Sequence, residues 1–478
     1  MKVFQTAFSK IADDNLMRFD EKFQRMMSTQ SWNVFDVKNK PLVRLSEVIE
    51  EDYQVFSYED DFDYKGIPTG KVYLDEDGDV VDFQAVTKDD HPGRLKYKIG
   101  KDSILISSLR LARSPALNFD NFDMDDYVFS NGFYIFKTKS GWNKKFVLHL
   151  LRSTKIKHIL DTSLYRGIGI SAYRSEDLLK LQIPNISIET QNEIVSRIEP
   201  IEKRIKEIKK TAKSVQAIID DFFARELGFN YIAFEVQQEN RYYTSQLGDF
   251  SNNPDLRFGA KFHRPAGQYV MRELHKITDK KIKHYLNEDK PIKLGASISP
   301  ADFDKEGSAY YISMATIKTC EVEFDDTQIV SDDYYKAKAV KSVKKGDIIV
   351  ARSGEGTIGK VALIRDDTNA IFCDFTMRIR FGENYNAEFA YFYFRTSYFQ
   401  YLIEIYKKGL GNNTNIFPIV MKEFPIPNLS KEEQDRLLQK LKIEINKQNE
   451  IKSKVAELRL EIEQAIYSNA IHREELKG

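Results

Sequence analysis

The chain has 478 residues, of which 42% are hydrophobic and 30% are charged, and 72 basic side chains balance 72 acidic ones. This length predicts two to four domains, and the charge balance gives no global sign of a nucleic-acid-binding protein. No apolar run approaches the roughly 20 residues of a membrane span, and the first residues do not have the pattern of a signal peptide. The two cysteines, Cys320 and Cys373, exclude a disulfide framework and suit a reducing cytoplasm, where we expect the protein.

Charge is unevenly distributed in the first quarter of the chain. Residues 47–63 hold eight acidic side chains and no basic one, whereas residues 94–113 hold six basic side chains and Asp102 as the one acid. Such patches could focus a polyanion locally. Ordinary surface variation produces similar patches, so charge alone does not decide between the two interpretations.

Outside two long helices the chain reads as mixed α/β (α+β). Strand-like apolar runs lie at residues 103–107, 134–136, 347–350 and 360–364. Predicted shorter helices, over residues 143–160 and 386–406, lie between and after these runs.

The first long helix is predicted within residues 183–229. Its apolar residues recur in steps that alternate between four and three, which is a heptad seam; they are Ile194, Ile198, Ile201, Ile205, Ile208, Ala212, Val215, Ile219 and Phe222. Ser187 and Thr190 can cap its start, and Gly228 can end it. Pro200 removes one backbone hydrogen bond, so we expect a bend there.

The segment Gly354–Val361 reads G-x-G-x-x-G and nearly reads as a P-loop. A phosphate loop should open a helix, but here Lys360–Ile364 continues as a strand, and Val361 stands where a P-loop has Ser or Thr. The segment instead predicts a tight basic hairpin, in which arginine can grip guanine edges or phosphate. The residues predicted to line it are Arg352, Ser353, Thr357 and Lys360.

The second long helix is predicted within residues 426–478, with a seam of the same register. The seam residues are Leu437, Leu441, Ile451, Val455, Leu458, Ile462 and Ala465, and Glu444 and Gln448 interrupt it. Each helix spans about 40 residues, or about 60 Å. Each could pack on its own globular domain, but the natural partner of one is the other. This pairing predicts an antiparallel coiled coil and two halves related by a pseudo-two-fold axis.

The chain also contains an internal repeat of about half its length. Residues 183–198 (IPNISIETQNEIVSRI) and 426–441 (IPNLSKEEQDRLLQKL) share Ile, Pro, Asn, Ser, Glu and Gln, 243 residues apart. Further pairs follow in the same order. Residues 18–23 match 257–262, and Lys40–Leu42 match Lys290–Ile292. Asn143, Phe146 and Arg152 match Asn386, Phe389 and Arg395, and the glycines of 165–169 match those of 407–411. The order predicts two copies of one plan.

No catalytic or metal-binding arrangement is apparent in the sequence. The histidines show no H-E-x-x-H or comparable spacing; they are His91, His149, His158, His263, His275, His284 and His472. The nearest string to the N-P-P-Y motif of adenine methyltransferases, Asn252–Asp255, lacks the second proline and the aromatic residue. We therefore expect a non-catalytic binder or scaffold without a cofactor or a metal.

Two segments of the second half carry a family resemblance. Residues 345–354 (KGDIIVARSG), followed by 358–364 (IGKVALI), are similar to a hairpin in the recognition domains of specificity (S) subunits of Type I restriction–modification systems. Phe424–Leu429 with Glu433-Gln434 resembles that family's entry into its long helix. Residues 104–110 resemble another branch of the same domain type, so the resemblance extends over nearly the whole chain.

The resemblance implies two target-recognition domains that alternate with two long helical spacers. The implied boundaries are 1–182 for the first recognition domain, 183–229 for the first helix, 230–425 for the second recognition domain and 426–478 for the second helix. The first half lacks the Ser-Gly hairpin and has Thr190-Gln191 in place of Glu433-Gln434. The two domains should therefore read different sequences, which gives an asymmetric, two-part target.

The implied partners are double-stranded DNA, methyltransferase subunits (two of them), and restriction subunits through the complex, with no membrane. The methyltransferase partners would supply S-adenosylmethionine and the chemistry. Candidate DNA contacts lie in the Arg-bearing and Gly-rich loops. They are Ser107, Arg110, Arg113, Tyr165 and Arg166 in the first domain, and Arg352, Ser353, Thr357, Lys360, Asn412, Asn413 and Asn415 in the second.

The helical pair would then act as a ruler between two half-sites, because one DNA turn is about 34 Å long. Two alternatives stay open from the sequence. The chain could serve another restriction class, such as a Type IIB-like system, in which methylation and cleavage are fused in the partner. It could also be a coiled-coil scaffold that does not read DNA.

Overall fold

The computed structural model describes most of the chain between residues 41 and 471. The described residues are 41–69, 73, 80, 82–109, 116–117, 126–161, 172–240, 242–248, 262–288, 292–317, 319–324, 327–354, 356–409 and 413–471. Contacts divide the chain into two compact units. Unit 1 consists of Met1–Thr211 and Ser453–Gly478, and unit 2 of Ala212–Lys452. The domain boundaries expected from the sequence stay a prediction.

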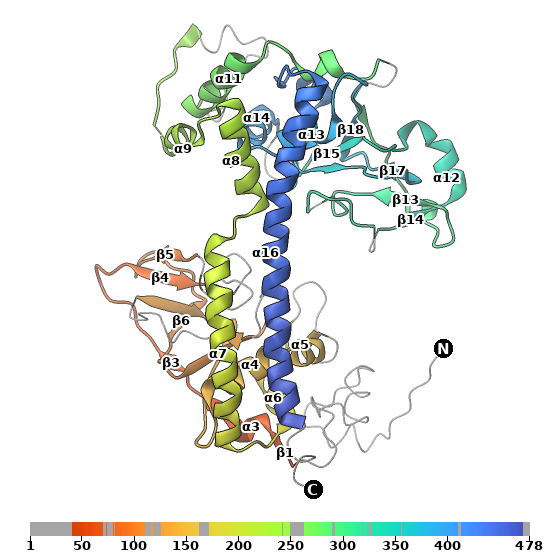
Figure 1. The fold of residues 1–478 in the computed structure, drawn as a ribbon. Helices are drawn as coiled ribbons and strands as arrows, with labels where there is room; N and C mark the ends of the chain where they lie inside the picture. The colour runs from red at the N-terminus through yellow and green to blue at the C-terminus, as the bar shows by residue number, and fades with distance from the viewer. Residues whose placement is uncertain are drawn as a thin grey trace. The chain divides into compact units, whose positions relative to one another are not determined.

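The described strands of unit 1 form sheets of five, four and two strands (Figure 1). The five-stranded sheet has the order β3 (Gln54–Val55), β6 (Leu95–Lys98), β9 (Tyr127–Ser130), β4 (Tyr64–Ile67) and β5 (Gln84–Val86). The four-stranded sheet has the order β2 (Ile49–Glu51), β10 (Phe133–Thr138), β7 (Ser103–Ser107) and β8 (Ala116–Leu117). Strands β1 (Leu42–Arg44) and β11 (Gln182–Pro184) pair antiparallel.

Helices cover one face of the four-stranded sheet in unit 1. They are α3 (Leu45–Val48), α4 (Lys144–Arg152), α5 (Thr154–Ile159), α6 (Ser175–Leu179) and α7 (Ile188–Thr211), with the second part of α16 (Lys431–Ile471). Ile104 and Ile106 of β7 point into their shared apolar core, whereas Leu105 points into a second core with residues of β4, β9 and β10. This alternation is the period-2 pattern of a strand that is buried on both faces.

Unit 2 has a four-stranded sheet and a three-stranded sheet among its described residues. The first has the order β12 (Lys293–Leu294), β18 (Thr376–Ile379), β15 (Ile348–Ala351) and β16 (Val361–Leu363). The second has the order β14 (Ile329–Val330), β13 (Ala309–Ile312) and β17 (Ala370–Phe372). Ile348 and Val350 of β15 face the helices, whereas Ile349 and Ala351 face the core shared with β13 and β17.

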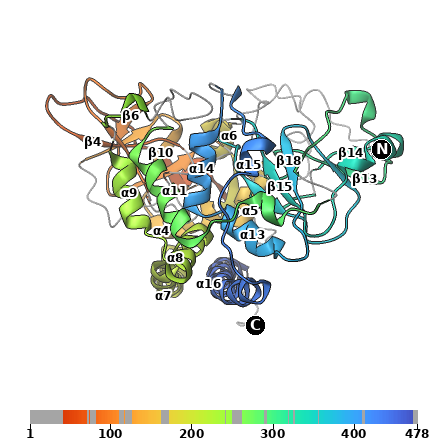
Figure 2. The same cartoon turned by 90° about the horizontal axis from the view of Figure 1, so that it is seen from above.

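Most helices of unit 2 pack around an aromatic core. They are α8 (Val215–Leu227), α9 (Tyr231–Glu239), α11 (Pro265–Ile277), α13 (Ala387–Phe394), α14 (Ser397–Tyr406), α15 (Pro418–Met421) and the first part of α16, with the 3-10 helix η2 (Ile282–Tyr285). Helix α12 (Asp332–Ala337) packs instead against the three-stranded sheet, and two further 3-10 helices are η3 (Pro300–Asp302) and η4 (Ala339–Lys341). Figure 2 shows α13 between the sheet and α16. All six residues from Phe389 to Phe394 are buried, because sheet and helices enclose α13 from several sides.

The two units share one strand plan, as the internal repeat predicts. The orders β2-β10-β7-β8 and β12-β18-β15-β16 are both antiparallel throughout. In each unit a second sheet contains an antiparallel pair followed by a parallel pair, β5-β4-β9 in unit 1 and β14-β13-β17 in unit 2. The predicted mixed α/β fold with two β-containing domains is therefore confirmed.

A buried glutamine anchors the start of the long helix in each unit. In unit 1, Gln191 Oε1 accepts a hydrogen bond from Asn143 N at 2.7 Å, and its Nε2 donates to Ile186 O at 2.7 Å. In unit 2, Gln434 makes the same two bonds with Asn386 N at 2.7 Å and with Leu429 O at 2.8 Å. Each pair of equivalent residues is 243 positions apart, so the Gln of the repeated motif is a structural residue.

One matched pair of the sequence repeat is wrong. Leu45 N donates to Leu181 O, and Ile282 N donates to Phe424 O, at equivalent places in the two units. Leu45 therefore corresponds to Ile282, and the segment before it does not correspond to Lys290–Ile292. The repeated segments 18–23 and 165–169 lie outside the described residues, as do 257–261 of the partner segment.

The long helices pair in antiparallel fashion within each unit, as predicted. In unit 1, Ile205 of α7 packs with Val455 and Leu458, and earlier residues of α7 pack with Ile466. In unit 2, Lys213 N donates to Gln448 Oε1 at 2.9 Å, and Lys440 lies 3.1 Å from Glu226. In both units, residues later in the first long helix contact residues earlier in α16, which is the arrangement of an antiparallel pair.

The first long helix is broken, where the sequence predicts one continuous helix. α7 ends at Thr211, and α8 begins at Val215 with Ser214 as its N-cap, whose hydroxyl accepts from Ala217 N at 3.0 Å. A capping serine offers the backbone an alternative to helical hydrogen bonds. The amide of Lys213 at the break is satisfied by Gln448, one of the two polar residues that interrupt the second seam. α7 continues through Pro200, where the expected bend stays a prediction.

The two shorter predicted helices are also divided at matching places. Ser153 caps α5 after α4, and Thr396 caps α14 after α13, again 243 residues apart. Each capping residue has extended backbone angles, which a continuous helix does not allow. Within the described part of the chain, every helix is too short or too polar to cross a lipid bilayer.

Candidate nucleic-acid interface

Three loops of unit 2 meet at one end of its four-stranded sheet. Their described residues are 352–354 and 356–360 between β15 and β16, 373–375 between β17 and β18, and 407–409 and 413–417 after α14. Arg352 connects them through its backbone, because its N donates to Phe375 O and its O accepts from Ile416 N, both at 2.9 Å. A bridge between Ser353 and Asn415 joins the first and third loops. We call these three loops the loop end of unit 2.

The glycine-rich segment is a closed hairpin and not a phosphate loop. Gly354 and Gly359 have φ angles of 87° and 88°, which favour glycine. The amides that a phosphate would need are engaged within the protein: Thr357 N and Ile358 N donate to Gly354 O, and Gly359 N donates to Ala351 O. The hairpin predicted from the sequence is thus confirmed by β15 and β16.

The guanidinium group of Arg352 is held between two loops. Its Nε donates to Asp374 O at 2.7 Å, and its Nη1 donates to Asn415 Oδ1 at 3.0 Å. The Nδ2 of Asn415 in turn donates to Asn413 O at 3.0 Å. Arg352 and Asn415 therefore stabilise the loop end directly, and their predicted base contacts would need the groups that these bonds leave available.

Four further predicted residues of unit 2 lie in the same region. Ser353 is buried, and Thr357 is half-buried with its hydroxyl donating to Ser353 O at 2.9 Å. Lys360 is half-buried, and Asn413 is exposed. The loop end thus brings together six of the seven predicted residues of the second domain, and the seventh, Asn412, lies outside the described residues.

A buried ion pair at the opposite end of β15 stabilises the sheet. Asp347 is fully buried, and Arg380 forms two bonds of 2.6 Å with its carboxylate. Arg378 is also buried near this pair, and burial lowers the pKa of its guanidinium group, although the charge of Asp347 opposes that shift. Arg378 is part of the domain core, and Arg380 is held by the buried carboxylate of Asp347.

In unit 1 one predicted contact can be placed. Ser107 is buried in β7, its hydroxyl donates to Leu109 O at 3.1 Å, and its carbonyl accepts from Tyr173 Oη at 2.7 Å. A DNA contact by this side chain is not supported by its position in the core. Arg110, Arg113, Tyr165 and Arg166 lie outside the described residues.

Strand register shows which residues of the two units are equivalent at this end. Leu105 pairs with Ile135, and Ile349 pairs with Arg378, which sets an offset of 244 along β7 and β15. Ser107 is therefore equivalent to Ala351, and Ser108 is equivalent to Arg352.

The sequence also missed two exposed aromatic side chains at the loop end. Phe375, whose O accepts from Arg352 N, is 50% exposed, and Phe417, which follows the second backbone partner Ile416, is 40% exposed. A sequence signal for them is weak, because phenylalanine is common in this chain and usually predicts core.

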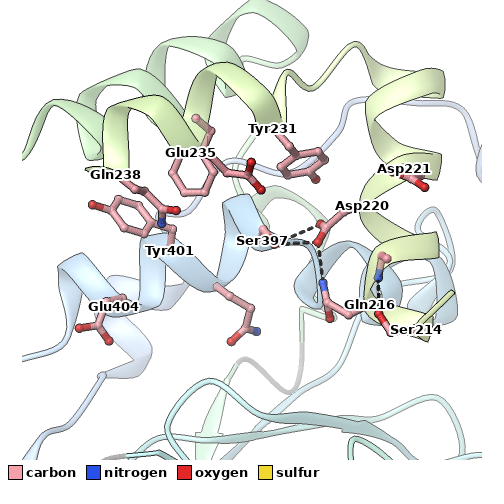
Figure 3. A pocket seen from close by; sticks show the side chains of 13 residues that line it. Ser214, Gln216, Asp220, Asp221, Tyr231, Glu235, Gln238, Ser397, Tyr401 and Glu404 are labelled. Atoms are coloured by element: carbon pink, nitrogen blue, oxygen red, sulfur yellow. Dashed lines mark hydrogen bonds between the residues drawn. The ribbon is translucent and has the colours of Figure 1, made fainter. Parts of the chain in front are cut away.

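A separate cavity of about 610 Å³ in unit 2 is acidic (Figure 3). Asp220 accepts from Ser397 N and Oγ, Asp221 pairs with Lys213, and Glu404 also lines the cavity. This charge would repel DNA phosphates, so the cavity is not part of the candidate interface. Among the described residues, no three His, Cys, Asp or Glu side chains lie close enough to hold a metal ion.

Comparison with known proteins agrees with this geometry. Residues 290–461 match the family model of the Type I restriction modification DNA specificity domain. The matched segment includes the β15–β16 hairpin, the loop end, the Gln434 anchor and much of α16. No curated protein sequence matches the chain at a significant level.

Three solved structures are similar to the chain in fold, at low identity. A structure concerned with complex assembly and conformational transition of the type I R-M system is 16% identical, has a TM-score of 0.42, and aligns over 92% of this chain and 99% of that one. The HsdS subunit from Thermoanaerobacter tengcongensis is 15% identical, with a TM-score of 0.32 over 90% and 95% of the two chains. The Type I S subunit from M. genitalium is 13% identical, with a TM-score of 0.37 over 91% and 96%.

The family model matches the part of the chain that contains the hairpin and the second long helix, and unit 1 repeats the same strand plan and glutamine anchor. The resemblance seen in the sequence is thereby supported for residues 290–461, which are similar to the DNA specificity domain of Type I restriction–modification systems.

Proposed function

We propose that the chain reads a bipartite, asymmetric DNA target, with one half-site read by each β-containing domain. Two observations support this proposal. The two units share a strand plan, so each can offer the same kind of loop end. Their loops differ, because unit 2 has the Ser-Gly hairpin and unit 1 has no equivalent sequence. Two copies of one scaffold with unlike loops are suited to two unlike half-sites.

The proposed contacts of the second domain are the residues at its loop end. Asn413 and Lys360 can approach DNA as side chains, whereas Arg352 and Asn415 also hold the loops together. Cationic side chains usually contact phosphates, and amides can read adenine through N6 and N7. The proposed contacts of the first domain are Arg110, Arg113, Tyr165 and Arg166.

We further propose that the paired long helices act as a ruler between the half-sites. Helix pairs of this kind are stiff, and a rise of about 1.5 Å per residue converts helix length into distance. The seam of α16 pairs with α7 in unit 1 and with α8 in unit 2. Both long helices would therefore contribute to the proposed ruler along their length.

The proposed partners are methyltransferase subunits, two of them, and restriction subunits that join through the complex. These partners would dock on the exposed faces of the long helices, which carry apolar side chains such as Ile443 and Leu460, both more than half exposed. The methyltransferase would supply S-adenosylmethionine and the methyl transfer. A balanced net charge is compatible with partners that share the contacts to DNA phosphates.

Genome-wide mapping of methylated bases tests the proposal directly. Cells with the chain and its methyltransferase partner should carry methylated bases within one two-part sequence, and deletion of the chain should remove that methylation. A methylation map that does not depend on the chain would contradict DNA readout and would favour a scaffold role.

A further inference from the structure

The loop ends of the two units have the same backbone hydrogen bonds. In unit 1, Ser108 N donates to Gly132 O at 3.0 Å, and Tyr173 N donates to Ser108 O at 3.3 Å. In unit 2, Arg352 makes the equivalent bonds with Phe375 O and Ile416 N, both at 2.9 Å. The bridges Leu109–Ala172 and Ser353–Asn415 are equivalent as well. The two backbones can therefore be compared position by position.

At three equivalent positions of this shared backbone the side chains are unlike. Ser108 corresponds to Arg352, Gly132 corresponds to Phe375, and Arg174 corresponds to Phe417. Arg174 is the residue that precedes α6, and Phe417 is the residue that precedes α15. Since the backbone hydrogen bonds are the same in both units, this backbone does not require exposed phenyl rings at Phe375 and Phe417, and these two side chains are free to serve recognition.

Phe375 is the most informative of these residues. It lies at the tip of a tight turn that Thr376 N closes by donating to Cys373 O at 2.9 Å, and half of its surface is exposed. In unit 1 the same turn has glycine, where a Cβ atom would lie 2.8 Å from the side chain of Thr69. The turn is therefore formed without any side chain in one unit and presents a phenyl ring in the other.

Arg352 holds the turn of Phe375 at two points. Its backbone N donates to Phe375 O, and its Nε donates to Asp374 O. The ring is therefore presented from a backbone that is already positioned, which reduces the ordering cost of a contact on binding. An exposed apolar ring gains free energy when a ligand covers it.

We propose that Phe375 reads a thymine in the half-site of the second domain, through contact with the 5-methyl group in the major groove. This proposal rests on the proposed function of the chain. The 5-methyl group of thymine is the apolar group that a base pair shows in the major groove, and phenylalanine is among the side chains that contact it. Phe375 thereby supplies a specificity element that unit 1, with Gly132, lacks.

The test uses the full chain assembled with its methyltransferase, and a duplex that contains the methylated sequence found by mapping. Each thymine is replaced in turn by uracil, which lacks only the 5-methyl group. One replacement in one half-site should lower the affinity about four-fold, the value expected for one buried methyl group. Phe375→Ala should bind the thymine duplex less tightly and should show no further loss with uracil.

Two further variants serve as controls. Phe375→Gly copies the residue of unit 1 and should behave like Phe375→Ala, with an unchanged melting temperature. Ile232→Ala removes an exposed apolar side chain on α9 and should keep the uracil effect.

The proposal is overturned if no thymine replacement changes the affinity, if the second half-site contains no thymine on either strand, or if Phe375→Ala retains the full uracil effect. Each of these results leaves sequence-specific binding by the wild-type complex intact. Absence of sequence-specific binding would instead refute the proposed function.

Discussion

Arg352 contributes two side-chain hydrogen bonds that join the turn of Asp374 to the loop of Asn415. Lysine has a single ammonium group and cannot reproduce this planar, two-directional contact. We expect Arg352→Lys to lower the affinity of the assembled complex for its target about ten-fold, because hydrogen bonds from a charged donor contribute roughly 1.5–3 kcal/mol each. Binding isotherms on the mapped target measure this effect.

Arg365→Lys is a matched control for that substitution. Arg365 also makes several side-chain bonds, to Glu321 and Glu388, but it lies after β16, away from the loop end. It should leave the affinity unchanged. Equal losses for the two variants would show that the effect of Arg352 is a general loss of stability and not a property of the loop end.

At this scale the sequence located the loop but not the use of its residues. Arg352, Ser353 and Thr357 were predicted from a local pattern, and Asn415 from an amide-rich turn, and the structure brings all four together. The bond between Arg352 and Asn415 joins residues 63 positions apart, which local spacing cannot predict. Phe375 was missed because recognition depends on exposure, and exposure follows from the turn and the surrounding fold.

The long helices are held in place by buried polar side chains as well as by their apolar seam. Gln434 is fully buried and satisfies both Asn386 N and Leu429 O. Gln434→Leu keeps the approximate volume but leaves two backbone groups unpaired. We expect it to lower the free energy of unfolding of the chain by about 2–4 kcal/mol, since an unsatisfied buried group costs roughly 1–3 kcal/mol. Chemical denaturation followed by circular dichroism measures the change.

Gln439→Leu provides the comparison on the same helix. Gln439 is exposed, so its replacement removes no buried hydrogen bond and should change stability by less than about 0.5 kcal/mol. If Gln434→Leu were as mild as this variant, the glutamine anchor would not explain why both repeats carry Gln at this position.

The helical seam predicted the pairing of the long elements but not the break between α7 and α8. Apolar periodicity continues through Ala212 and Val215, so a pattern of period 3.5 cannot show that Ser214 caps a new helix. The second seam contained the complementary signal. Gln448 interrupts this second seam, and its side-chain Oε1 accepts a hydrogen bond from Lys213 N at the break. This match could be recognised only when both helices were compared.

At the scale of the whole molecule, the ordered repeat predicted two copies of one strand plan, and the shared sheet orders confirm it. Individual pairs such as Lys40–Leu42 with Lys290–Ile292 failed, because the offset drifts wherever one copy carries a longer loop. Order along the chain was therefore a better guide than any single match, and it supports the proposal of two readers joined by paired helices.

The ruler proposal predicts that helix length sets the spacer and nothing else. Insertion of one heptad into α7 beside Ile205, together with one heptad into α16 beside Val455, preserves the seam that these residues form. Seven residues add about 10 Å, which corresponds to about three base pairs at roughly 34 Å per turn of ten. Methylation mapping should then find the same two half-sites with a spacer about three base pairs longer.

Insertion into α7 alone is the control, because it shifts one seam against the other and should abolish methylation through loss of pairing. A double insertion that alters either half-site sequence, or that methylates the original target with its original spacer, would contradict the ruler. The first result would mean that the helices take part in reading bases. The second would mean that the distance between half-sites is set by another part of the complex, such as the methyltransferase subunits.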